Sequence, residues 1–182
     1  MTTDRNAIVV LATLLALSGC LTLDAKLAPT GEATITMSYV MEKATLPMAR
    51  QDMQGPHVTV KRAEWADGRG SFDLAVDDAQ KLSTSKMFSR AKVGIQDGKA
   101  EGTKELNVTI RNERPTRLKP EVIERIGKEV RLTIELPGEV VTSNATSTKG
   151  MAATWTIPTD EFLTKPEIVL DAVYKAPPSP KS

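Results

Sequence analysis

Residues 1–20, MTTDRNAIVVLATLLALSGC, constrain this chain more than any other segment. A short polar start containing Asp4 and Arg5 is followed by an uncharged, mainly apolar run at 7–17. A membrane-spanning helix needs about 20 apolar residues, so this run is too short to span and has the length of a signal-peptide hydrophobic region. The run leads directly to Cys20, the single cysteine of the chain, so no intramolecular disulfide can form.

The tetrapeptide 17–20, Leu-Ser-Gly-Cys, resembles the lipobox of bacterial lipoproteins. In that motif the chain is cut just before the cysteine and the thiol is acylated. Small residues at Ser18 and Gly19 suit a narrow peptidase cleft, and a thiolate is a strong nucleophile for lipid transfer. We therefore expect cleavage between Gly19 and Cys20 and acyl groups such as palmitate on Cys20. The alternatives are a plain secretory signal or a buried N-terminal helix with a chance cysteine.

Acylation at Cys20 would place the protein on the extracytoplasmic face of a bacterial membrane, held there by its lipid. One acyl chain anchors only marginally at about 0.8 kcal/mol per buried methylene, whereas two or three chains hold firmly. Residue 21 is leucine rather than aspartate. This resembles lipoproteins that are sorted outward, so we expect an outer-membrane location if the host has a second membrane.

Length and charge limit the class of protein further. The chain has 182 residues and a net charge of +1, from 24 basic and 23 acidic residues. A nucleic-acid partner is not expected, because binding to phosphates requires a basic excess. We expect a signal peptide at 1–19, a single domain at 20–175 and a disordered tail, APPSPKS, at 176–182.

Alternating apolar and polar residues predict many short strands in the expected domain. The clearest alternations lie at 23–27, 33–39, 72–76, 106–110, 130–136 and 168–174. Turn signals separate them, as at 29–32, Asp67-Gly68 and Asp97-Gly98. Short helices are expected at 79–88 and 121–127, and 41–54 is expected to be an irregular loop around Pro47. The prediction is an α+β domain with about eight or nine short strands, mainly antiparallel, and two short helices.

Three pieces in the last third of the chain carry a family resemblance. They are LTIELPGEVV at 132–141, Ser143-Asn144-Ala145, and Trp155-Thr156. This pattern, together with a lipobox leading straight into a strand, resembles the mycobacterial LppM type of lipoprotein domain and is similar to the DUF3153 lipoproteins. The resemblance implies a membrane-tethered cell-envelope domain with a lipid-handling role.

The sequence gives little support for catalysis. His57 is the single histidine, and no Gly-x-Ser-x-Gly motif supplies a nucleophile for it. Cys20 is expected to be consumed by acylation, and the aspartates at 67, 73, 77 and 78 do not match an EF-hand loop. We therefore expect a protein that is not an enzyme, with no catalytic residues, no metal site and no cofactor.

Two functions stay open from the sequence. In the first, the domain binds a phospholipid or glycolipid in an apolar cleft, with a lining expected at Met37, Tyr39, Val122, Ile126 and Trp155. The alternative is a structural or assembly lipoprotein that recruits an envelope protein partner. That alternative predicts a filled core and an exposed patch instead of a cavity.

Overall fold

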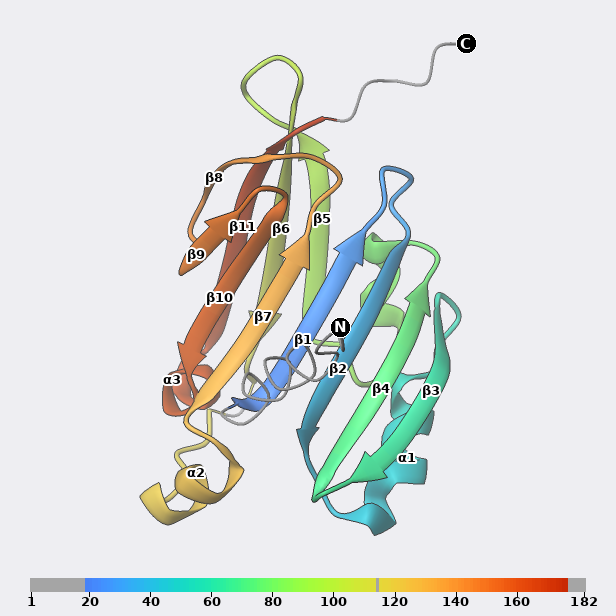
Figure 1. Cartoon of the computed structure of the whole chain (residues 1–182), viewed down its shortest axis with the longest axis vertical. Helices are drawn as coiled ribbons and strands as arrows, with labels where there is room; N and C mark the ends of the chain where they lie inside the picture. Colours follow the sequence, from blue (N-terminus) through green and yellow to red (C-terminus); the bar gives the residue numbers. More distant parts are fainter. Residues whose placement is uncertain (1–18, 114, 177–182) are drawn as a thin grey trace, which may run out of the picture.

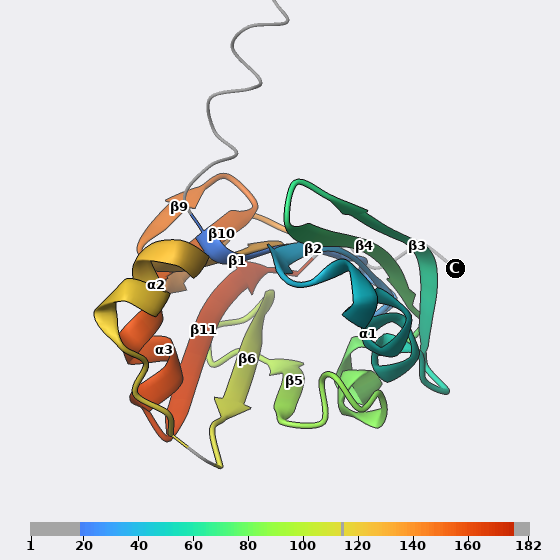
Figure 2. The ribbon, with the colours of Figure 1, turned by 90° about the horizontal axis from the view of Figure 1, so that it is seen from below.

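Two β-sheets packed face to face make up the body of this protein, as shown by a computed structural model that describes residues 19–113 and 115–176. The two sheets enclose the interior, with α2 and α3 at one side and α1 at the other (Figure 2). The expected signal peptide lies outside the described residues apart from the backbone of Gly19, and the expected tail lies outside them apart from Ala176.

Eleven strands and several short helices are present in the described part of the chain (Figure 1). The strands are β1 (Gly19–Leu27), β2 (Ala33–Val40), β3 (Val58–Ala66), β4 (Arg69–Val76), β5 (Ala91–Asp97), β6 (Thr103–Arg111), β7 (Glu129–Glu135), β8 (Val140–Ser143), β9 (Ser147–Lys149), β10 (Ala152–Pro158) and β11 (Glu167–Lys175). The α-helices are α1 (Leu46–Met53), α2 (Pro120–Ile126) and α3 (Thr159–Thr164), and the 3₁₀ helices are η1 (Lys43–Thr45) and η2 (Ala79–Thr84).

The larger sheet has seven strands in the order β3-β4-β2-β1-β7-β10-β9, and the smaller has four in the order β5-β6-β11-β8. Nearly all neighbours are antiparallel, as expected. The exception is the parallel pair β1–β7, in which Leu23 lies opposite Leu132 and Ala25 lies opposite Ile134. This pair joins the start of the domain to its last third, so β1 lies in the middle of the larger sheet.

The expected strands and hairpins are largely confirmed. The turn at 29–32 connects β1 to β2, with Leu27 opposite Ala33, and the Asp67-Gly68 turn connects β3 to β4. Asp67 and Gly68 both have positive φ, 51° and 78°, which suits the tight hairpin predicted from this dipeptide. The α+β class follows from strong strand patterning with only short helices between the strands.

Two details of the predicted strands and helices need correction. Eleven strands are present in the described residues where eight or nine were expected, and one of the additional strands is the short β9, Ser147–Lys149, which contains no apolar residue and so shows no alternation. The helix expected at 79–88 is the 3₁₀ helix η2, capped by Asp78, whose Oδ1 accepts a hydrogen bond from the Gln80 amide at 2.9 Å. The helix expected at 121–127 is present as α2.

The segment expected to be an irregular loop, 41–54, was also predicted incorrectly. Its second half forms α1, and Pro47 lies in the first turn of that helix, where proline costs no hydrogen bond. Ala49 and Met53 are four residues apart, so they share one face of α1, and both are buried. Pro47 therefore lies at the start of a helix, whereas the sequence pattern predicted it in the middle of an irregular loop.

The apolar core is divided into two clusters. One forms mainly between β7, β10, β6 and β11 and includes Leu132, Trp155 and Leu170. The other forms under β2, β3, β4 and α1 and includes Met53 and Phe72. Three inward residues of β1 and the first residue of β2 touch both clusters but are themselves only partly buried: Leu21, Leu23, Ala25 and Ala33. A divided core with inward residues that are only partly buried indicates a hollow between the sheets.

Candidate functional site

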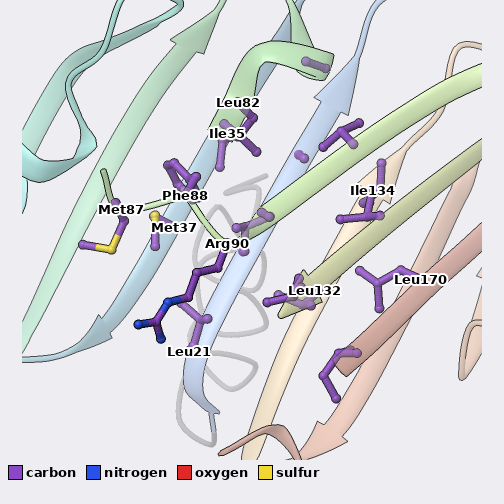
Figure 3. Close-up of a pocket in the computed structure, with 18 of the residues that line it drawn as sticks. Leu21, Ile35, Met37, Leu82, Met87, Phe88, Arg90, Leu132, Ile134 and Leu170 are labelled. Atoms are coloured by element: carbon purple, nitrogen blue, oxygen red, sulfur yellow. The ribbon is translucent and has the colours of Figure 1, made fainter. Parts of the chain in front are cut away.

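An apolar cavity of about 410 Å³ lies between the two sheets (Figure 3). This volume falls within the range of roughly 300–1,000 Å³ that is usual for small-molecule sites. Its walls are formed by Leu21, Leu23, Ala25, Leu27, Ala33, Ile35, Met37, Ala79, Leu82, Met87, Phe88, Arg90, Ala91, Val93, Leu106, Val108, Ile110, Arg111, Asn112, Leu132, Ile134, Phe162, Leu163, Ile168 and Leu170. Almost all of these side chains are aliphatic or aromatic, so the cavity suits an apolar guest.

The strand pattern explains why the cavity is apolar. Alternate residues of a strand point to the same face, so Leu21, Leu23 and Ala25 of β1 all face the interior. The neighbouring strands add Ile35 and Leu132 at matching register positions. The outward positions between them are polar, as on any sheet with one solvated face.

One end of the cavity has a polar rim built by β6, α3 and the segment before β5. The backbone N–H of Arg111 donates to the Arg90 carbonyl at 3.0 Å. Asn112 is tied to α3 and to the start of β11, with its Nδ2 donating to the Leu163 carbonyl at 2.5 Å and its backbone N–H to the Pro166 carbonyl at 2.8 Å. The rim is therefore a hydrogen-bonded frame rather than a loose loop.

This rim lies at the end of the molecule where β1 begins. Gly19 lies opposite Glu129 in the β1–β7 pair, and Pro158, just before α3, lies opposite the same Glu129 in the β10–β7 pair. The first residue of the wall, Leu21, follows Cys20 directly and lies near Arg90 and Met37 at the cavity (Figure 3). The backbone at the expected acylation position is thus next to the rim.

Of the five residues expected to line a cleft, Met37 is in the cavity wall. Tyr39, two residues further along β2, is not in the wall and stacks on Phe72, with ring centroids 5.7 Å apart. Burial, with a smaller contribution from the Asp52 carboxylate, raises the pKa of Tyr39 above its ordinary value. Tyr39 thus has a place in the second core cluster.

Val122, Ile126 and Trp155 also lie outside the wall. Val122 and Ile126 belong to α2 and are partly buried there. Trp155 is 4% exposed and packs in the first core cluster, where its Nε1 donates to Asn144 Oδ1 at 2.7 Å. Trp155 therefore fills the core and does not lie in the cavity wall, where it was expected.

Sequence reasoning missed most of the wall. Phe162 and Leu163 come from α3, a six-residue helix that was not expected, and Arg90 comes from an irregular stretch between η2 and β5. Of the wall residues of β1, Leu23, Ala25 and Leu27 were predicted as alternating apolar strand residues, whereas Leu21 precedes the predicted strand. Alternation identifies which residues face inward, but it does not distinguish a filled interior from a hollow one.

Other kinds of site find little support in the part of the chain that the structure describes. No group of three or more His, Cys, Asp or Glu side chains there could hold a metal ion. His57 Nδ1 lies 2.7 Å from Asp77 Oδ1 in an exposed pair at the surface. Within residues 19–113 and 115–176, no helix has the length and apolar character needed to cross a membrane.

The fold has a counterpart among solved structures. The chain is similar to the folded domain of LppM from Mycobacterium tuberculosis, determined by NMR, with a TM-score of 0.52 and 14% sequence identity. The match covers 91% of this chain and 95% of that domain. No model of a known protein family matches the sequence, and no curated protein matches it. The protein therefore has an LppM-like fold, and the similarity to DUF3153 stays a prediction.

Proposed function

We propose that this chain is a cell-envelope lipoprotein whose folded domain binds the acyl part of a membrane lipid in the cavity between its two sheets. The observation that carries the proposal is the divided core, in which Leu21 and Leu23 of β1 face inward but are only partly buried around about 410 Å³ of apolar space. A domain that only recruits a partner has no need for such a cavity. The likeness to a domain of a protein named as a lipoprotein agrees with this proposal.

Burial of a hydrocarbon chain would supply the binding energy. Each methylene removed from water contributes about 0.8 kcal/mol. Because Leu23, Ala25 and Leu132 already point at the space, the guest would meet a preformed wall with few polar groups to desolvate. The cavity therefore favours phospholipids or glycolipids, whose headgroups could stay at the rim.

Native mass spectrometry tests the lipid proposal on residues 20–182 with Cys20→Ser, a span that holds both sheets and both core clusters. We expect this protein, purified from bacterial cells, to carry one lipid per chain, which organic extraction then identifies. A protein that is empty on purification and stays empty after incubation with phospholipid and glycolipid vesicles would contradict the proposal.

We further propose that Cys20 is acylated and anchors the domain outside the cytoplasm, on the outer membrane in a host with two membranes. The lipobox-like residues 17–20 support this, and so does the position of Leu21 in the cavity wall. A lipid anchor at this point would hold the rim close to the bilayer, so that a lipid could enter the cavity without crossing much water.

The anchoring proposal predicts a clear labelling result in a bacterial host. The unaltered chain should incorporate an alkyne-tagged palmitate analogue and fractionate with membranes, whereas the Cys20→Ser chain should lose the label and the cut at residue 19. The matched control, Ser18→Ala, keeps a small residue before the cut and should behave like the unaltered chain. Labelling that survives Cys20→Ser would place the acyl group elsewhere.

A further inference from the structure

We propose that the cavity rim selects lipids with an anionic headgroup and that Arg90 binds this headgroup. Glu113 pairs with Arg90 when the cavity is empty and competes with the headgroup when a lipid binds. This inference rests on the proposed function in one respect: the tail of the guest must lie in the apolar cavity. It adds the chemical class of the headgroup and the residues that recognise it.

Arg90 is placed at the boundary between the apolar wall and solvent. It lies between Phe88, which is buried in the wall, and Ala91, which begins β5 and also belongs to the wall. Figure 3 shows its side chain at the cavity near Leu21 and Met37. About half of the Arg90 side chain is exposed. A guest with its tail among the leucines would therefore bring its head to this guanidinium.

The other two polar residues of the wall are less well placed to bind a headgroup. Asn112 uses its Nδ2 in the bond to the Leu163 carbonyl. Arg111 lies opposite Glu167 across the β6–β11 pair, with its Nε 3.5 Å from a Glu167 oxygen, and its side chain is 73% exposed, so it lies further out in solvent than that of Arg90. Arg90 is therefore the wall residue best placed to bind a headgroup.

The present partner of Arg90 is a weak one. Its Nη2 lies 3.4 Å from Glu113 Oε2, and the side chains of Arg90 and Glu113 are 49% and 70% exposed. Ion pairs of this kind contribute only about 0–1 kcal/mol, because water screens them and both side chains lose freedom. A phosphate or carboxylate held in place by its buried tail can accept two parallel N–H bonds from a guanidinium, which is a stronger arrangement. An anionic headgroup can thus displace Glu113.

Three probes with one identical oleoyl tail separate the headgroup from the tail: oleate, oleoyl-lysophosphatidylglycerol and the neutral monooleoylglycerol. Each is titrated below its micelle concentration into residues 20–182 with Cys20→Ser, and into the same protein carrying one further change. Arg90→Gln should weaken the two anionic probes about tenfold, the effect of losing one charged hydrogen bond of about 1.4 kcal/mol. It should leave the neutral probe within about twofold.

Glu113→Gln should change the affinity for the anionic probes in the opposite direction, which gives a second, independent test. It removes the competing carboxylate, so the affinity for both anionic probes should rise about threefold while the neutral probe is unchanged. The matched control is Arg62→Gln, which removes an arginine from another exposed ion pair, with Glu64 at 2.5 Å on the edge strand β3. That variant should change none of the three affinities by more than about twofold.

The possible results separate this inference from the proposed function. Binding of all three probes with no effect of Arg90→Gln, or an equal loss for all three, would leave lipid binding in place and overturn the headgroup role. Failure of every probe to bind would overturn both proposals. An effect confined to oleate would assign a fatty-acid carboxylate, and one confined to the lysophospholipid would assign a phosphate, and either result supports Arg90 as the headgroup ligand.

Discussion

Trp155→Ala lowers the free energy of unfolding by about 3–5 kcal/mol, the usual loss when a buried aromatic side chain is removed from a core. Trp155 is 4% exposed and lies opposite Leu132 in the β7–β10 pair. Its removal leaves a void in the first core cluster and also removes the donor to Asn144 Oδ1. Because whole domains are stable by only about 5–15 kcal/mol, this loss should be visible as a large drop in the urea midpoint.

Two further variants serve as comparisons for this measurement. Trp155→Phe keeps an aromatic ring but loses the indole N–H, so it should cost about 1–2 kcal/mol. Trp65→Ala removes the other tryptophan of the chain, which is on the edge strand β3 and only partly buried, with its Nε1 donating to the Met41 carbonyl at 2.9 Å. That variant should cost less than Trp155→Ala. Equal losses for the two alanine variants would mean that Trp155 is not a central core residue.

The residues that carried the family resemblance have structural roles. Asn144 joins β10 and β11, because its Oδ1 accepts from Trp155 Nε1 and from the Asp171 backbone at 2.8 Å, and its Nδ2 donates to the Val169 carbonyl at 2.9 Å. β10 and β11 belong to different sheets, so Asn144 fastens the two sheets together. The short motif thus indicates a fold and carries little information about a ligand.

Pro137-Gly138 has a related explanation. A Cβ built on Gly138 would lie 1.9 Å from the Lys175 carbonyl oxygen, so no side chain fits where this turn passes the end of β11. The sequence predicts a turn at this dipeptide from local preferences alone. The close approach of β11, nearly 40 residues later, is a long-range fact that local preferences cannot reveal.

In the site, too, local sequence patterns predicted part of the cavity wall, whereas the features that depend on long-range contacts could not be predicted. Alternation identified Met37 as an inward residue, and the strand containing Leu23 and Ala25 was also predicted. Tyr39 has the same parity as Met37, yet it stacks on Phe72 instead of lining the cavity. Pairing of β1 with β7, and of β11 with β8, builds the two sheets that face each other across the cavity, and these pairings depend on contacts far apart in sequence.

Ala25→Trp is expected to abolish lipid binding, with a loss of at least about 100-fold in affinity that corresponds to roughly 2.7 kcal/mol. Ala25 lies at the middle of β1, opposite Ile35 on one side and Ile134 on the other, and its side chain is part of the cavity wall. An indole at this position would project into the space that the lipid tail is proposed to occupy. Lipid carried through purification, measured by native mass spectrometry, should fall to background.

The matched control is Ala75→Trp on β4. Ala75 alternates with the buried Leu74 and Val76, so it lies on the outer face of the same sheet and outside the cavity wall. The Ala75→Trp variant should therefore bind lipid like the unaltered protein. Because the indole of Ala25→Trp enters an existing hollow, its overpacking cost should stay below the 1–3 kcal/mol or so that is usual in filled cores. A folded Ala25→Trp protein that still carries lipid would place the binding site elsewhere, whereas loss of lipid from a variant that stays folded would locate the site between the sheets.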